Sequence, residues 1–174
     1  RQPRLQRVQR WLAKGNHADG ARLQALLGWD TRWPWATYGG LVQDATAAGI
    51  PLFGGNLSRA EVNALLASNT SVRFPMPTAR QRLSAVVLAQ HADAAPMLEG
   101  MLAVQQARDT RMAQALTAAP APALLVAGRW HVLRGTGVPG YLPPEVPALV
   151  IALASPDEGV DAADADLLWV PGDE

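Results

Sequence analysis

A histidine follows a glycine at the end of an apolar run, in the segment Leu125-Val-Ala-Gly-Arg-Trp-His131. Ligand sites in open α/β sheets lie beyond the carboxyl ends of the strands, and a glycine there lets the backbone turn sharply. Imidazole can ligate iron or zinc, or carry a proton near neutral pH. His131 is therefore the first candidate for a ligand-binding and metal-binding residue. The alternative is a histidine that only makes hydrogen bonds at the end of a strand.

The remaining polar candidates lie on or beside predicted helices. His91 stands at a predicted helix end, where the alternative is a solvated histidine favoured by the helix dipole, and His17 is predicted to lie at the surface. Arg108 and Asp109 are adjacent within a helix, and Met112 shares a face with Arg108. The alternative for this arginine and aspartate is a solvated helical face with a salt bridge.

Tyr38 and Tyr141 are the only two tyrosines of the chain, and a phenolate can bind ferric haem as an axial ligand. Packing is the alternative for each of them. Trp130, next to His131, has the shape to flank a flat ligand. The sequence contains no G-x-G-x-x-G, Walker A, H-E-x-x-H or G-x-S-x-G motif, so a kinase, an NAD enzyme or a serine hydrolase has no positive support.

The composition indicates one ordinary globular domain, which we place over residues 1–174. Of the residues, 49% are hydrophobic, which excludes a disordered chain. Fifteen Lys and Arg balance fifteen Asp and Glu, so no strong positive field favours nucleic-acid binding. There is no cysteine, and no apolar run is long enough for a membrane span.

The helices and strands that the sequence predicts indicate an α/β fold, with a mostly parallel sheet flanked by helices. Apolar spacing predicts helices near 3–15, 19–27, 35–48, 59–67, 78–91 and 96–117. Short apolar runs predict strands at 50–53, 123–127, 149–153 and 167–170. Because the chain opens with a helix and not with a strand, we expect the first strand of the sheet to lie upstream of Arg1, which makes this chain an N-terminally truncated one.

Several segments, taken in order, resemble the ChaN-like haem-binding uptake family. The Arg-Asp-x-x-Met-Ala helix, followed by Gly-x-x-His and Gly-Val-Pro, is the most specific part of the resemblance. The whole of it covers roughly residues 29 to 171 and rests on these segments: Trp33-Pro-Trp35 with Tyr38, residues 49–59, His91, residues 105–113, Leu125 to His131, Gly137-Val-Pro139 and residues 165–170.

The resemblance implies an α/β fold, haem binding, lipid anchoring at the bacterial outer membrane, and dimers that enclose haem. It also implies kinship with the erythromycin-esterase and Tiki superfamily, whose paired Gly-x-x-His motifs are matched here only by Gly128 to His131. The family's Gly-Glu-x-His motif has no match before Trp29, which puts a paired-histidine metal site in doubt.

We therefore expect a protein of bacterial haem uptake that holds haem and does not transform it. The expected partners are haem, a second copy of the chain and an outer-membrane haem receptor, and the expected location is the periplasm or the outer membrane. His131 is the expected ligand or pocket histidine, with Tyr141 or Tyr38 as the alternative axial ligand. Arg108 is expected to pair with a haem propionate and Asp109 to orient Arg108 or a histidine. Two alternatives stay open, namely a metal-dependent hydrolase that uses His131, His91 and Asp109, and an interaction domain without a cofactor.

Overall fold

The computed structural model describes residues 2–14, 19–68, 71–91, 93, 95–154 and 160–170. Contacts within the chain fall into two compact units, Arg1–Gly54 and Gly55–Glu174, and each unit is described by itself. His17, predicted to lie at the surface, falls outside the described residues. No helix within these ranges combines the length and the apolar character that crossing a bilayer requires.

The first unit consists of helices, and capping residues define both ends of the second one. Asp19 is the N-cap of the second helix, where its carboxylate accepts a hydrogen bond of 2.8 Å from the Arg22 N–H. Gly28 ends that helix in the left-handed region with φ of 60°, a conformation that glycine adopts without strain. The first helix packs on the second, and the second on the third. The helices are α1 (Gln2–Leu12), α2 (Gly20–Leu27) and α3 (Trp35–Ala47).

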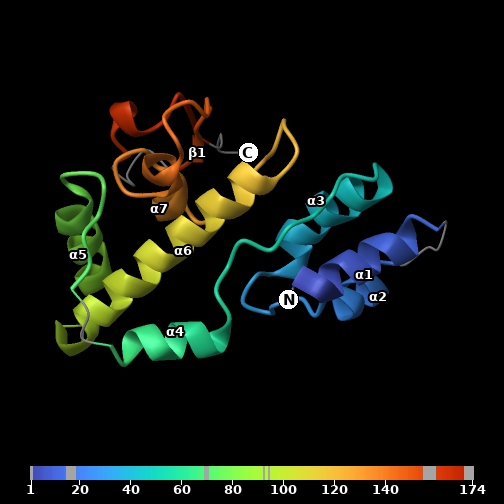
Figure 1. The fold of residues 1–174 in the computed structure, drawn as a ribbon, viewed down its shortest axis with the longest axis horizontal. Coiled ribbons are helices and arrows are strands. Elements are labelled where there is room, and N and C mark those ends of the chain that lie inside the picture. The colour runs from blue at the N-terminus through green and yellow to red at the C-terminus, as the bar shows by residue number, and fades with distance from the viewer. Residues whose placement is uncertain are drawn as a thin grey trace. The chain divides into compact units, whose positions relative to one another are not determined.

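The second unit is organised around its longest helix, α6, which contacts α4, α5 and η2 (Figure 1). Ser58 and Glu61 form a capping box at the start of α4. Gly100 lets α4 approach α6 closely, because a Cβ at Gly100 would lie 2.8 Å from the Leu66 carbonyl oxygen. The helical elements are α4 (Arg59–Leu66), α5 (Ala79–Gln90), η1 (Ala95–Met97), α6 (Leu98–Ala118), α7 (Arg129–Val132), η2 (Val138–Tyr141) and η4 (Ala162–Asp164).

Two apolar clusters along α6 form the core of the second unit. One joins α5 to the first half of α6 and consists of Phe74, Ala79, Leu83 and Leu102. The other joins the second half of α6 to η2 and consists of Met112, Ala113 and Val138. Tyr141 packs against both clusters, so η2 is held along the length of α6.

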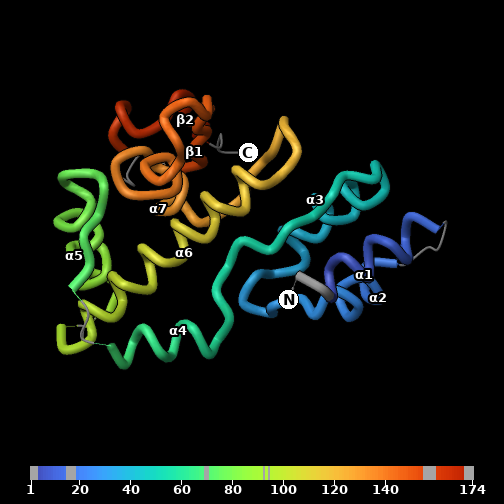
Figure 2. The backbone as a smooth tube through the Cα atoms, viewed as in Figure 1, coloured from blue at the N-terminus to red at the C-terminus, as the bar shows by residue number. Residues whose placement is uncertain are grey.

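A small parallel sheet follows the helices in the second unit. Strand β1 (Ile151–Leu153) pairs with β2 (Leu167–Trp169), and both are labelled in Figure 2. In this register Ile151 lies opposite Leu167, and Leu153 lies opposite Trp169. Ala152 is fully buried, whereas Ile151 and Leu153 are exposed on the other face. The predicted α/β fold with parallel strands is confirmed, and both strands lie within the predicted ranges 149–153 and 167–170.

Two of the predicted strands are wrong, because residues 50–53 and 123–127 form no strand in this structure. A segment becomes a strand only when a neighbour completes its hydrogen-bond ladder, and in the described part of the chain the only ladder joins β1 and β2. The second segment keeps the side-chain alternation of a strand: Leu125 and Ala127 pack against the Met112 cluster, while Leu124 and Val126 are exposed.

Candidate functional site

His131 lies in the four-residue helix α7, where the sequence predicts a loop. Gly128 is the N-cap of this helix, and its carbonyl accepts a hydrogen bond of 2.9 Å from the His131 N–H. The next turn crosses the back of the helix at Gly137. A Cβ at Gly137 would lie 2.8 Å from His131 Cα and closer still to the His131 carbonyl, so only glycine fits. The buried Thr136 hydroxyl donates to the Trp130 carbonyl at 3.0 Å and holds this turn in place.

Asp164 ties the turn after α7 to the rest of the second unit. Its carbonyl accepts from the Arg134 N–H at 3.0 Å, and its carboxylate accepts from the Gly135 N–H at 2.9 Å. The same carboxylate forms an ion pair with Arg82 of α5. The hydrogen bond from Arg82 is the largest cause of a lowered pKa at Asp164.

The imidazole of His131 meets a fully buried carboxylate from α6. The His131 Nδ1 lies 2.5 Å from Asp109 Oδ1, and the Gln105 amide lies 2.9 Å from the same ring nitrogen. Gln105 Nε2 also donates to Asp109 Oδ2 at 3.3 Å. The spacing of Gln105 and Asp109 puts them one turn apart on α6, so a single helix face supplies both contacts to His131.

The contact with Asp109 fixes which ring nitrogen of His131 faces outward. When Asp109 is ionised its carboxylate can only accept, so Nδ1 then carries the proton and donates to Asp109 and does not accept from the Gln105 amide. The Nε2 atom then keeps its lone pair, and no described residue makes a hydrogen bond to it. The His131 side chain retains 17% exposure, whereas that of Asp109 has none. A carboxylate that orients an imidazole in this way is a recurrent support for histidines that ligate metals.

Burial and charge act in opposite directions on Asp109. Burial raises its pKa, and the hydrogen bond from His131 is the largest opposing cause. The positive charge of Arg108, the preceding residue on α6, also lowers the pKa of Asp109. A buried carboxylate without such partners would be costly, so the position of Asp109 depends on His131 and Gln105.

Tyr141 lies in η2, close enough to Asp109 for the carboxylate charge to act on it. Burial, followed by the charge of Asp109, raises the pKa of the Tyr141 phenol well above its usual value. Its buried hydroxyl makes no hydrogen bond of good geometry to any described residue, although the Gln106 side chain lies near it. Trp130 packs on the Phe74 cluster, with the Arg129 guanidinium 4.9 Å from its ring centre.

Two predicted site residues do not belong to this group of contacts. Tyr38 belongs to α3 of the first unit, where its ring packs against Trp33 in a tilted arrangement, with 4.7 Å between the ring centres. His91 is the exposed C-cap of α5, and its N–H donates to the Val87 carbonyl at 3.0 Å. Within the described ranges, no contact joins His91 to His131, and no three His, Asp or Glu side chains gather as they would around a metal ion.

Sequence reasoning missed the residues that hold α7 in place. Thr136 and Asp164 had no motif to mark them, and their roles follow from contacts between segments far apart in the sequence. Gly137 stood in the Gly-Val-Pro segment, but its closeness to the His131 backbone is visible only in three dimensions.

Comparison with known proteins decides the family. Residues 1–142 match the family described as haem-binding uptake, Tiki superfamily, ChaN. The chain belongs to this ChaN family. A solved structure described as cofacial haem binding to ChaN of Campylobacter jejuni matches with a TM-score of 0.80 and 20% identity, over 95% of this chain and 67% of that one. No curated protein sequence matches the chain.

These comparisons confirm the family predicted from the sequence, and with it haem as the ligand of the family. The structural likeness, at 20% identity, establishes the α/β fold shared with the ChaN structure. No finding favours the alternative of a metal-dependent hydrolase.

Proposed function

We propose that this chain binds haem as cargo during iron uptake and that His131 presents its Nε2 to the haem iron. The observation that carries the proposal is the hydrogen bond of 2.5 Å between Asp109 and His131 in a chain of the ChaN family. Neutral imidazole with a free Nε2 is the form of histidine that ligates haem iron. Asp109 keeps His131 in that form and orientation.

The side chains around His131 suit a planar, largely apolar ligand with iron at its centre. Trp130 supplies a flat apolar surface from the residue next to the histidine, and Tyr141 lies in the adjoining η2 turn. Arg108 is the candidate partner for a propionate, because its guanidinium matches the geometry of a carboxylate. The donor set therefore combines one nitrogen ligand, apolar contact area and a cation.

The two tyrosines differ as alternative axial ligands. Tyrosinate ligation requires loss of the phenolic proton, and burial at Tyr141 opposes that loss by raising its pKa. The Tyr38 ring is half-buried against Trp33 in the first unit. Because burial disfavours tyrosinate at Tyr141, Tyr38 is our second proposal for the axial ligand.

A haem titration followed by visible spectroscopy tests these assignments. We expect a saturable Soret shift with the native chain. The pattern of visible absorption bands should change with His131→Ala and stay the same with Tyr141→Phe. His91→Ala is the matched control, because His91 is an exposed histidine at the end of α5. An unchanged spectrum and affinity in His131→Ala, together with a loss in Tyr38→Phe, would transfer the ligand role to Tyr38.

We also propose that the chain acts in the periplasm or at the outer membrane, as a lipid-anchored homodimer that exchanges haem with an outer-membrane receptor. Membership of an uptake family supports this proposal, since uptake requires haem to cross the cell envelope. Sedimentation with and without haem measures the dimer, and fractionation of the native cells locates the protein. A monomer at all haem concentrations would refute the dimer.

A further inference from the structure

Charge is distributed unequally between the two units, although the whole chain is neutral. Residues 1–54 contain seven Lys or Arg, three Asp and no Glu, which gives a net charge of +4. Residues 55–174 contain eight Lys or Arg and twelve Asp or Glu, which gives −4. The first unit therefore attracts anions, and the candidate haem site in the second unit does not account for this charge.

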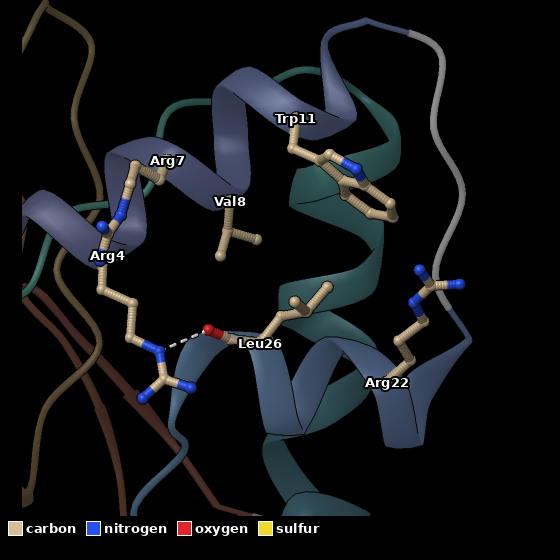
Figure 3. Close-up of a pocket in the computed structure, with 6 residues that line it drawn as sticks. All are labelled: Arg4, Arg7, Val8, Trp11, Arg22 and Leu26. Carbon is tan, nitrogen blue, oxygen red and sulfur yellow. Dashed lines mark hydrogen bonds between the residues drawn. The ribbon is translucent and has the colours of Figure 1, made fainter.

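A pocket between α1 and α2 collects much of this positive charge. It has a volume of about 410 Å³, and Figure 3 shows Arg4 and Arg7 at one end and Trp11 with Arg22 at the other. The apolar side chains of Val8 and Leu26 lie between the two ends. The pocket thus offers cations beside an apolar surface, which suits an amphiphilic anion.

The arginines of the pocket have different partners. Arg4 is fixed, because its Nε donates to the Leu26 carbonyl at 2.7 Å and its Nη2 to the Ala25 carbonyl at 2.6 Å. Arg22 lies over the Trp11 ring, 5.1 Å from the ring centre. No carboxylate among the described residues forms an ion pair with Arg4, Arg7 or Arg22, whereas Arg32 outside the pocket pairs with Asp30.

We propose that this pocket binds an amphiphile with an oxyanion head group, a phosphate or a carboxylate. Arg7 binds the head group beside the fixed guanidinium of Arg4, since guanidinium donors match both kinds of oxyanion. The apolar body of the ligand lies along Val8 and Leu26 towards Trp11, whose ring is held by Arg22. The ligand is either a free molecule or the head group of a lipid in a membrane surface.

Two assays on the full chain distinguish a free ligand from a lipid head group. Calorimetry measures binding of octanoate and of dihexanoyl phosphatidylglycerol, both as monomers in solution. Sedimentation measures binding to phosphatidylcholine vesicles with and without one quarter phosphatidylglycerol. Arg7→Gln is the test variant, and Arg10→Gln is its matched control, because Arg10 is an exposed arginine of the same helix outside the pocket.

We expect Arg7→Gln to weaken binding about tenfold, the effect of losing one charged hydrogen bond, and Arg10→Gln to weaken it less than about twofold. Binding to the soluble probes supports a free ligand, and binding to the anionic vesicles alone supports a lipid head group. Equal losses in the two variants would show an effect of overall charge and refute the pocket. Absence of binding to every probe would refute it as well. Haem titration of the same variants is a separate measurement. A loss of haem binding would therefore be distinguished from a loss of binding in this pocket.

Discussion

Replacing Asp109 with asparagine tests the claim that this carboxylate acts through His131. The substitution keeps the size of the side chain and removes its charge. Asp109 is fully buried and contacts His131 Nδ1 at 2.5 Å, so water cannot take its place. An asparagine oxygen can still accept from Nδ1, but its amide group can also turn and present a donor, which would favour the other tautomer of His131.

The size of the effect follows from the kind of hydrogen bond that is lost. A hydrogen bond to a charged group contributes about 1.5–3 kcal/mol and a neutral one about 0.5–1.5 kcal/mol. The midpoints of these ranges differ by about 1.3 kcal/mol, which corresponds to nearly a tenfold change in haem affinity. Partners that orient metal ligands have effects of about 10- to 100-fold, so the estimate stands at the lower end of that range.

A double-mutant cycle provides the assay. Haem affinity is measured by Soret titration for the native chain, Asp109→Asn, His131→Ala and the double variant. If Asp109 acts only through His131, adding Asp109→Asn to His131→Ala changes affinity by less than about twofold, because the pair is already broken. Independent, additive losses would refute the reasoning and would give Asp109 a role of its own towards the ligand.

Three further predictions concern the fold around the site. Gly137→Ala should lower the melting temperature by about 2–10 °C, because the added Cβ would overlap the His131 backbone and such overpacking costs about 1–3 kcal/mol. Thermal unfolding followed by circular dichroism measures this change. Asp164, whose pKa is lowered from 3.8, should contribute stability above pH 3.8 that is lost as pH falls through its folded pKa. In Asp164→Asn, the free energy of unfolding measured with urea should therefore fall less between pH 7 and pH 2 than in the native chain. An equal fall in both proteins would contradict the role of Arg82. Tyr141→Phe should leave stability unchanged or raise it, because the hydroxyl is buried without a good hydrogen bond, and a lowered melting temperature would show a missed partner.

The helices and their caps could be predicted from sequence, because their signals are local. Asp19 and Ser58 accept from backbone N–H groups three residues ahead, so type and spacing suffice to place both helix starts. Strands are harder to predict, because a segment forms a strand only when another segment pairs with it. Residues 149–153 and 123–127 have similar apolar runs, yet only the first contains a strand, because only there does a neighbouring segment complete the ladder.

The candidate site was predictable as a set of residues and not as an arrangement. His131 and Asp109 were each singled out, but the hydrogen bond between them joins α7 to α6 across 22 positions of sequence. Gln105 lies one turn before Asp109 on α6, and nothing in the sequence marks its contact with the imidazole. The pocket between α1 and α2 could not be predicted, because only the packing of the two helices brings Arg4 and Arg7 of α1 together with Arg22 of α2.

The junction at Asp164 also determines how the candidate site opens. Its carbonyl and carboxylate hold two adjacent amides, those of Arg134 and Gly135, just after the helix that carries His131. These amides can exchange with solvent only when η4 moves away, so the turn behind the histidine and η4 should open as one cooperative unit. We therefore expect the stability of the turn behind His131 to depend on a segment beyond residue 142, outside the part of the chain that matches the family.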